Sequence, residues 1–177
     1  FSKYSGLLNI DEVENIDNAW TEVASKLNID IKDLKKAIEP MTAIYAIAEH
    51  SRALLVAIAD GALPSNTGGG YNLRVILRRS LAFIDKFNLN IKLSEVAEWH
   101  ANELKPLFPE LLNNIKEVKE ILDFETEKYQ QTKAKAKTIV QKIIKQDKIS
   151  DEMLLELYDS NGISPEIVRE EAVNLGK

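Results

Sequence analysis

The chain has 177 residues, of which 45% are hydrophobic, and it carries a net charge of -5 and no cysteine. A chain of this length buries about 70% of the surface of its unfolded form, which allows a domain with its own core. The absence of cysteine excludes disulfides, iron–sulfur clusters and thiolate zinc sites within this sequence and is typical of an intracellular protein.

The most apolar segment, 41–59, is interrupted by Glu49, His50 and Arg52 and falls short of the roughly 20 apolar residues that span a membrane. We therefore expect no membrane partner. The sequence starts at Phe1 with neither a methionine nor a signal-peptide pattern, so we interpret it as a piece of a longer cytoplasmic protein.

Apolar residues recur at helical spacing and strand-like alternation is nearly absent, which predicts an all-α fold of about seven to eight helices. We expect a first helix from about Asp11 to Leu27 and a short helix opened by Asp30. Pro40 is predicted to begin a further helix that ends near Asp60, because proline is favoured in a first turn. That helix is apolar on most sides and is expected to form the buried centre of the domain.

Gly61 fits a helix C-cap, and later helices are expected over about 71–87 and 94–104. From about 110 to 146 a thin apolar stripe runs through a charged sequence, which predicts a protruding arm or a helical hairpin. We therefore expect one domain over 1–177, divided into a helical body (1–108), a long helical arm (109–149) and a C-terminal helix pair (150–177).

Charge is distributed unevenly along the chain. Seven lysines and one acidic residue lie between Lys128 and Lys148, whereas the first 62 residues carry six basic and ten acidic side chains. A basic segment of this kind can steer a polyanion to one face of the protein. The alternative is a solvated lysine face without a partner.

Motifs for catalysis are absent from the sequence. There is no GxxxxGK or GxGxxG motif, and the glycines 68–70 before a helix are only a weak signal for an anion site. His50 and His100 have no partner at metal-ligand spacing and are expected to be structural. We therefore expect no catalytic residue, no metal and no cofactor in this chain.

The segment from Glu39 to Ser80 joins an apolar helix to a Pro-Ser-Asn-Thr-Gly-Gly-Gly loop and then to a helix with three arginines. An exposed amide at Asn66 beside a cationic helix start suits a surface that reads nucleic acid. The segments AEHSRA (48–53), IADGALPSN (58–66) and GYNLRVILRR (70–79) resemble the alanyl-tRNA synthetase family, as does LYDSNG (157–162). EWH (98–100), LKPLFPE (104–110) and the first residues resemble its archaeal-type branch, so the resemblance covers essentially the whole chain. The chain departs from the pattern at Glu49, where aspartate is usual, and after Gly162.

The resemblance implies a helical tRNA-recognition domain of an ATP-dependent alanine–tRNA ligase. ATP and Mg²⁺ would belong to a catalytic core, and zinc to an editing domain, outside this chain, which is expected to be inactive alone. The implied partners are the acceptor stem of tRNA(Ala) and the rest of the synthetase, not DNA. Asn66 and Asp159 fall on the family positions that read a guanine–uracil wobble pair in that stem.

Those residue types suit the wide, shallow minor groove of A-form RNA. There guanine offers a 2-amino donor and pyrimidines an O2 acceptor. A carboxylate such as Asp159 accepts from the amino group, and an amide such as Asn66 can donate and accept at once. Phosphate contacts would position the stem, and we expect them from five cationic side chains, namely Arg74, Arg78, Arg79, Lys133 and Lys137.

Structural roles remain open for the same residues. Asn66 could form an Asx turn, and Asp159 could cap the Asn161-Gly162 turn. The arginines could instead pair with Asp60 or Glu49 and hold two helices together. For the chain as a whole, the alternatives are a protein-interaction module built on 110–146 or a structural spacer between domains.

Overall fold

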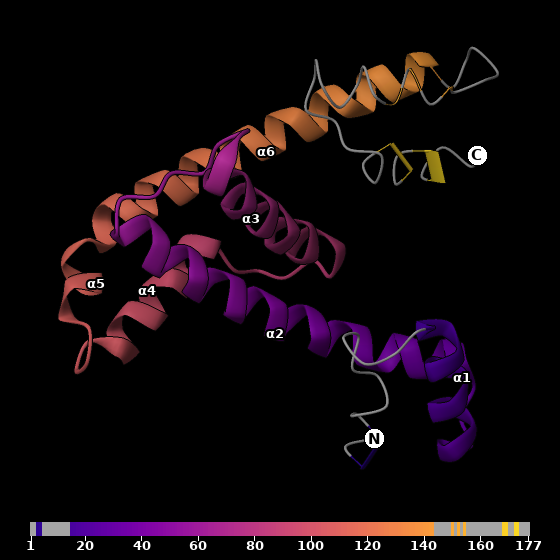
Figure 1. Ribbon diagram of the computed structural model, residues 1–177. Coiled ribbons are helices and arrows are strands. Elements are labelled where there is room, and N and C mark those ends of the chain that lie inside the picture. Colours follow the sequence, from indigo (N-terminus) through magenta and orange to yellow (C-terminus); the bar gives the residue numbers. More distant parts are fainter. Residues whose placement is uncertain are drawn as a thin grey trace.

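The computed structural model describes residues 3–4, 15–143, 150, 152, 154, 168–169 and 172–173. These residues contain helices and no strand, which confirms the predicted all-α fold. Six helices follow one another, and they are α1 (Ile16–Leu27), α2 (Ile31–Ala59), α3 (Gly68–Lys86), α4 (Leu93–Leu104), α5 (Pro109–Asn113) and α6 (Ile115–Ile143) (Figure 1). Most of the predicted C-terminal helix pair lies outside the described residues, so the division into body, arm and pair stays a prediction.

The first two helices begin at side chains that cap them. Asn15 caps α1 because its Oδ1 accepts from the backbone N–H groups of Asp17 and Asn18, both at 3.1 Å. Asp11, the residue expected to open this helix, lies outside the described residues. Asp30 caps α2, as predicted, by accepting from the N–H of Lys32 at 2.8 Å.

The prediction that Pro40 begins a separate helix is wrong, because α2 runs through it from Ile31 to Ala59. Proline in a helix interior removes one backbone hydrogen bond and costs about 3 kcal/mol. Packing on both sides offsets that cost: Leu34 before the proline and Ala43 and Ile47 after it are all buried. Tertiary burial has therefore overridden a local stop signal.

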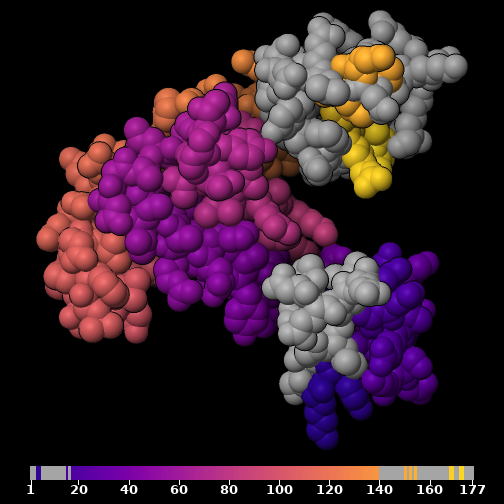
Figure 2. Space-filling model, viewed as in Figure 1, coloured from indigo at the N-terminus to yellow at the C-terminus, as the bar shows by residue number. Residues whose placement is uncertain are grey.

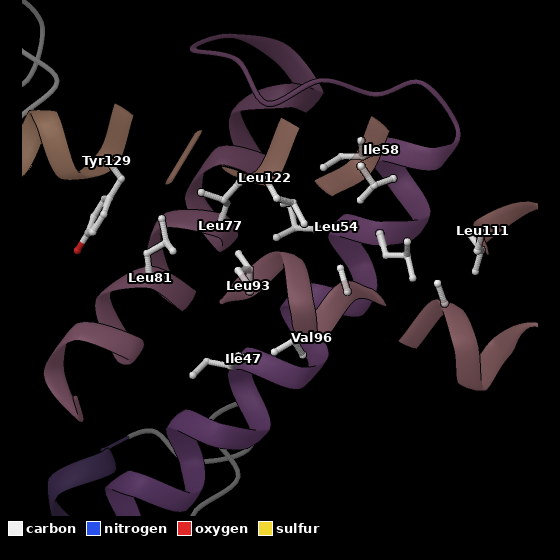
Figure 3. Packing of buried hydrophobic residues seen from close by; sticks show 14 residues of the cluster. Ile47, Leu54, Ile58, Leu77, Leu81, Leu93, Val96, Leu111, Leu122 and Tyr129 are labelled. Atoms are coloured by element: carbon white, nitrogen blue, oxygen red, sulfur yellow. The ribbon is translucent and has the colours of Figure 1, made fainter. Parts of the chain in front are cut away.

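The buried side chains form two apolar clusters that α2 connects. The main cluster joins α2 to α3, α4, α5 and α6, and Figure 3 shows Leu54 and Ile58 of α2 among side chains of the other helices. The smaller cluster joins Val23 and Ala24 of α1 to Leu34 of α2. Helix α2 is thus the centre of the domain, as the sequence indicated.

Helix α6 is a continuous helix of 29 residues, so the hairpin alternative is wrong over 115–143. It is separated from α5 by Asn114, whose Nδ2 donates to the Ala59 carbonyl at 3.2 Å and ties this corner to the end of α2. Val118, Leu122 and Tyr129 on its inner face are buried in the main cluster. The first half of α6 therefore belongs to the core of the body.

Helix α2 is also long and apolar enough to cross a membrane, judged by length and composition alone. The core helix of a globular domain meets the same criteria. Here seven residues of α2 are buried against the rest of the protein, and they are Leu34, Ala43, Ile47, Ser51, Leu54, Leu55 and Ile58.

A pair of substitutions on α2 tests which face is buried. Leu54→Ala should lower the free energy of unfolding by about 2–5 kcal/mol, because the fully buried side chain leaves a cavity. Val56→Ala, at a residue of the same helix that is 42% exposed, is the matched control and should cost about 0.5 kcal/mol or less. Urea unfolding followed by circular dichroism measures both, and equal losses would contradict this packing.

Candidate nucleic-acid interface

The loop between α2 and α3 begins with a helix-ending motif at Gly61, as predicted. The N–H of Gly61 donates to the Ile58 carbonyl and that of Ala62 to the Ala57 carbonyl, both at 2.9 Å. Gly61 has a φ of +91°, a conformation that glycine adopts without a steric penalty. The chain therefore leaves α2 sharply.

Ser65 and Gly70 close the loop onto the start of α3. The Ser65 N–H donates to the Gly70 carbonyl at 2.9 Å, and the Ser65 hydroxyl donates to the Thr67 carbonyl at 2.6 Å. A Cβ atom at position 70 would collide with the Leu63 carbonyl oxygen and the Ser65 side chain, whereas one at Gly69 would meet nothing within 4 Å. Gly70 is thus required for close approach of two backbone segments. Helix α3 starts at Gly68, three residues before the predicted start.

A largely buried arginine connects this loop to α6. Arg74 of α3 donates from Nε and Nη2 to the two carboxylate oxygens of Glu125, at 3.2 and 3.0 Å. Its Nη2 also donates to the Pro64 carbonyl at 3.1 Å, and its Nη1 donates to Oδ1 of Asn66. The side chains of Arg74 and Glu125 are only 15% and 7% exposed. In Figure 2 the magenta atoms of α3 lie near the orange atoms of α6.

These contacts bear on the roles expected for Arg74 and Asn66. The predicted phosphate contact of Arg74 gains no support, because the guanidinium is turned into the protein. Its alternative role in holding two helices together is supported, although the acid is Glu125 and not Asp60 or Glu49. Asn66 is exposed, and its oxygen accepts from Arg74 and not from its own loop as an Asx turn would require.

The other predicted phosphate contacts differ in exposure. Arg79 on α3 and Lys137 on α6 are exposed, and Arg78 is half-buried. Lys133 forms an ion pair with Asp85 of α3, with Nζ 3.0 Å from the carboxylate oxygen. Contact of these four residues with phosphate stays a prediction. Asp159, the second predicted base reader, lies outside the described residues, so its place relative to Asn66 also stays a prediction.

Both histidines connect helices. His50 Nδ1 of α2 lies 3.3 Å from the Ser80 hydroxyl of α3, and His100 Nε2 of α4 donates to the Ala48 carbonyl of α2 at 2.9 Å. Burial lowers the pKa of His50, as does the positive charge of Arg79, while Glu49 opposes them. In the part of the chain that the structure describes, no three His, Asp or Glu side chains are grouped to hold a metal ion.

Sequence reasoning missed Glu125, although one signal could have found it. The apolar stripe of α6 runs through Val118, Leu122 and Tyr129, and at its regular spacing position 125 should be apolar as well. An acid in that place is expected to be buried and therefore paired. The stripe alone does not indicate the partner, since Arg74 is 51 residues away in the sequence.

Comparison with known proteins shows the class to which this helical domain belongs. Residues 2–177 match the family model described as tRNA synthetases class II (A), and the chain belongs to this family. The curated relatives that it resembles are alanine–tRNA ligases, which confirms the resemblance to the archaeal-type alanyl-tRNA synthetases.

Three of these relatives show the extent of the match. The alanine–tRNA ligase of Methanocella arvoryzae is 41% identical over 171 residues, which cover 96% of this chain. Those of Methanococcus aeolicus and Halorubrum lacusprofundi are each 36% identical over 98% and 99% of the chain. The chain spans only about 19% of the length of each of these relatives.

Adjacent glycines provide a test of the loop. Gly70→Ala should destabilise the chain by about 1–3 kcal/mol, since the added methyl group has no space beside Leu63 and Ser65. Gly69→Ala is the matched control and should be neutral or stabilising by up to about 1 kcal/mol, because open space surrounds it. Urea unfolding of both variants measures the difference, and similar values would show that the loop is not closed in this way.

The lowered pKa of His50 predicts a pH dependence of stability. The unfolded chain binds a proton at this residue more readily than the folded chain, so stability should fall as the pH falls through about 6.5. His50→Gln should remove this part of the decline. Unfolding free energies at pH 7.5 and 5.0 give the slope for each chain, and identical slopes would show that His50 does not contribute.

Proposed function

We propose that this chain is the tRNA-recognition part of an alanine–tRNA ligase. It binds the acceptor stem of tRNA(Ala), and Asn66 and Asp159 read a guanine–uracil wobble pair in the minor groove. The observation that carries this proposal is the exposed Asn66 amide, held in a closed loop by the largely buried Arg74. Membership of the synthetase family supports tRNA as the ligand.

Exposed cations on α3 and α6 support a polyanionic partner. Arg79 of α3 and Lys137 of α6 are exposed on the two helices that the Arg74–Glu125 pair joins. Cations in such places position a phosphate backbone without reading its sequence. Discrimination is then left to the base readers, each of which contributes about 1–3 kcal/mol.

The chemistry of alanylation is assigned to other parts of the full-length, cytoplasmic enzyme. ATP and Mg²⁺ belong to its catalytic core and zinc to its editing domain, and the described residues of this chain offer no three-ligand group that fits a metal. This chain contributes recognition, so we expect it to be inactive without the rest of the synthetase.

A second role, packing against the rest of the synthetase, is favoured by one groove. A groove of about 390 Å³ between α2 and α4 is lined by Ile44, Ile47 and Trp99, and Trp99 is 59% exposed. Since the chain spans about 19% of its relatives, most of a full-length protein remains to cover this apolar surface. This role accompanies RNA binding and does not compete with it.

Binding to two acceptor-stem minihelices tests the proposal. The chain should prefer a stem with the guanine–uracil pair over one with guanine–cytosine at fixed salt. Asn66→Ala and Asp159→Ala should each reduce that preference by about 1–3 kcal/mol, or roughly 5- to 150-fold. Fluorescence anisotropy of labelled stems measures both affinities.

Arg79→Ala is the control for charge. It should weaken binding to both stems alike and reduce the slope of affinity against salt by about one unit, because a phosphate contact carries no sequence information. Equal binding of the two stems by the unsubstituted chain would contradict base reading by this domain.

A further inference from the structure

Glu125 is a carboxylate inside the apolar face of α6, and its pairing needs a physical reason. The side chain is 7% exposed and receives two hydrogen bonds from Arg74 and one from Lys128 Nζ at 3.3 Å. A buried ion pair of this kind is often no more stabilising than a well-packed apolar pair, because both charges lose their hydration. Its advantage lies in fixed geometry, and a bidentate arginine–carboxylate pair fixes the guanidinium plane.

The fixed guanidinium determines how the Asn66 amide is turned. Arg74 has donors only, so it can bond the oxygen of that amide but not its NH₂ group. With Oδ1 accepting from Arg74 Nη1, the oxygen faces the protein and the two N–H donors are directed away from the guanidinium. A second bond from Arg74 to the Pro64 carbonyl holds the backbone of the same loop. The pair therefore controls both the position and the polarity of the exposed side chain.

We propose that Arg74 and Glu125 are positioning residues that present Asn66 to RNA as a hydrogen-bond donor. Its partner is then a minor-groove acceptor such as the O2 atom of a pyrimidine. The guanine 2-amino group is itself a donor and cannot be this partner. The part concerning RNA rests on the proposed function, whereas the orientation of the amide does not.

The orientation can be tested without RNA. Arg74→Lys retains the charge, but a single ammonium group cannot hold Glu125, Pro64 and Asn66 together as the planar guanidinium does. The side-chain amide signals of Asn66, assigned by their loss in Asn66→Asp, should show an ordered group in the unsubstituted chain. In Arg74→Lys they should shift to the values of a mobile, solvated amide, with a lowered heteronuclear Overhauser effect.

Urea unfolding shows that the compared chains are folded, and Glu125→Gln provides a second variant if Arg74→Lys is not. A purely structural role would lower stability while leaving the Asn66 amide ordered in the folded molecules. An unchanged amide in a folded Arg74→Lys or Glu125→Gln chain would overturn the proposal.

The isosteric change Asn66→Asp separates the two faces of the amide. It keeps an acceptor toward Arg74 and removes both donors, so loop stability should be retained. Uracil is displaced in the wobble pair, so its O2 lies elsewhere than the O2 of a paired cytosine, and the donors of Asn66 are proposed to meet only the former. Preference for the guanine–uracil minihelix over the guanine–cytosine one should therefore fall roughly 5- to 150-fold, as in Asn66→Ala. The added negative charge weakens both stems alike and cancels in this ratio. Retained preference in Asn66→Asp would overturn donor presentation.

The exchange of charges in Arg74→Glu with Glu125→Arg is the matched control for helix pairing. It restores an ion pair between α3 and α6 but places acceptors against the Pro64 carbonyl and the Asn66 oxygen. Stability should recover relative to either single variant, while wobble preference should not, because a carboxylate at position 74 can hold the amide only by its N–H donors and leaves its oxygen outward. If stability and wobble preference both recover, the pair acts only by joining the helices. If the unsubstituted chain shows no preference for the guanine–uracil minihelix, the proposed function is wrong. The NMR measurement of the Asn66 amide still decides whether Arg74 orients that amide.

Discussion

A charge withdrawn from water must find a partner, and in this domain the charge is the carboxylate of Glu125. It lies in the face of α6 that packs into the core, so leaving it unpaired would cost several kcal/mol. Arg74 satisfies it from α3 and uses its remaining donors on the loop between α2 and α3. The arrangement of an exposed loop is thus set by a requirement of the interior.

Two contacts connect the surroundings of this loop to α6 and to the residue before it. Asn114, directly before α6, donates to Ala59 at the end of α2, and Glu125 within α6 accepts from Arg74. The two residues are eleven positions apart in the chain, or about 16 Å along a helix. In the loop between α2 and α3, the chain turns at Gly61 and closes at Gly70, where a side chain would collide with the loop. The position of the short loop between α2 and α3 therefore depends on its contacts with α6 and with the residue before it.

Local signals in the sequence predicted most of the described fold, and contacts over long distances account for what they missed. Asp30, Gly61 and the helix near 94–104 were predicted correctly because caps and apolar spacing act within a few residues. Pro40 was misinterpreted because burial on both sides outweighs a local stop signal. At the site, the loop around Asn66 was predicted. The orientation of the Asn66 side-chain amide was not, because it depends on Arg74, whose partner is 51 residues away in the sequence.

The position of Pro40 between the two apolar clusters has a dynamic consequence. The smaller cluster joins α1 to the residues of α2 before the proline, and the main cluster takes the residues after it. Elements that share few buried contacts open as separate cooperative units, each with its own free energy. Amide hydrogens of α1 and of the first turns of α2 are expected to exchange with solvent at a lower opening free energy than those around Leu54. Fraying at that end of the molecule would then leave the loop beside α6 undisturbed.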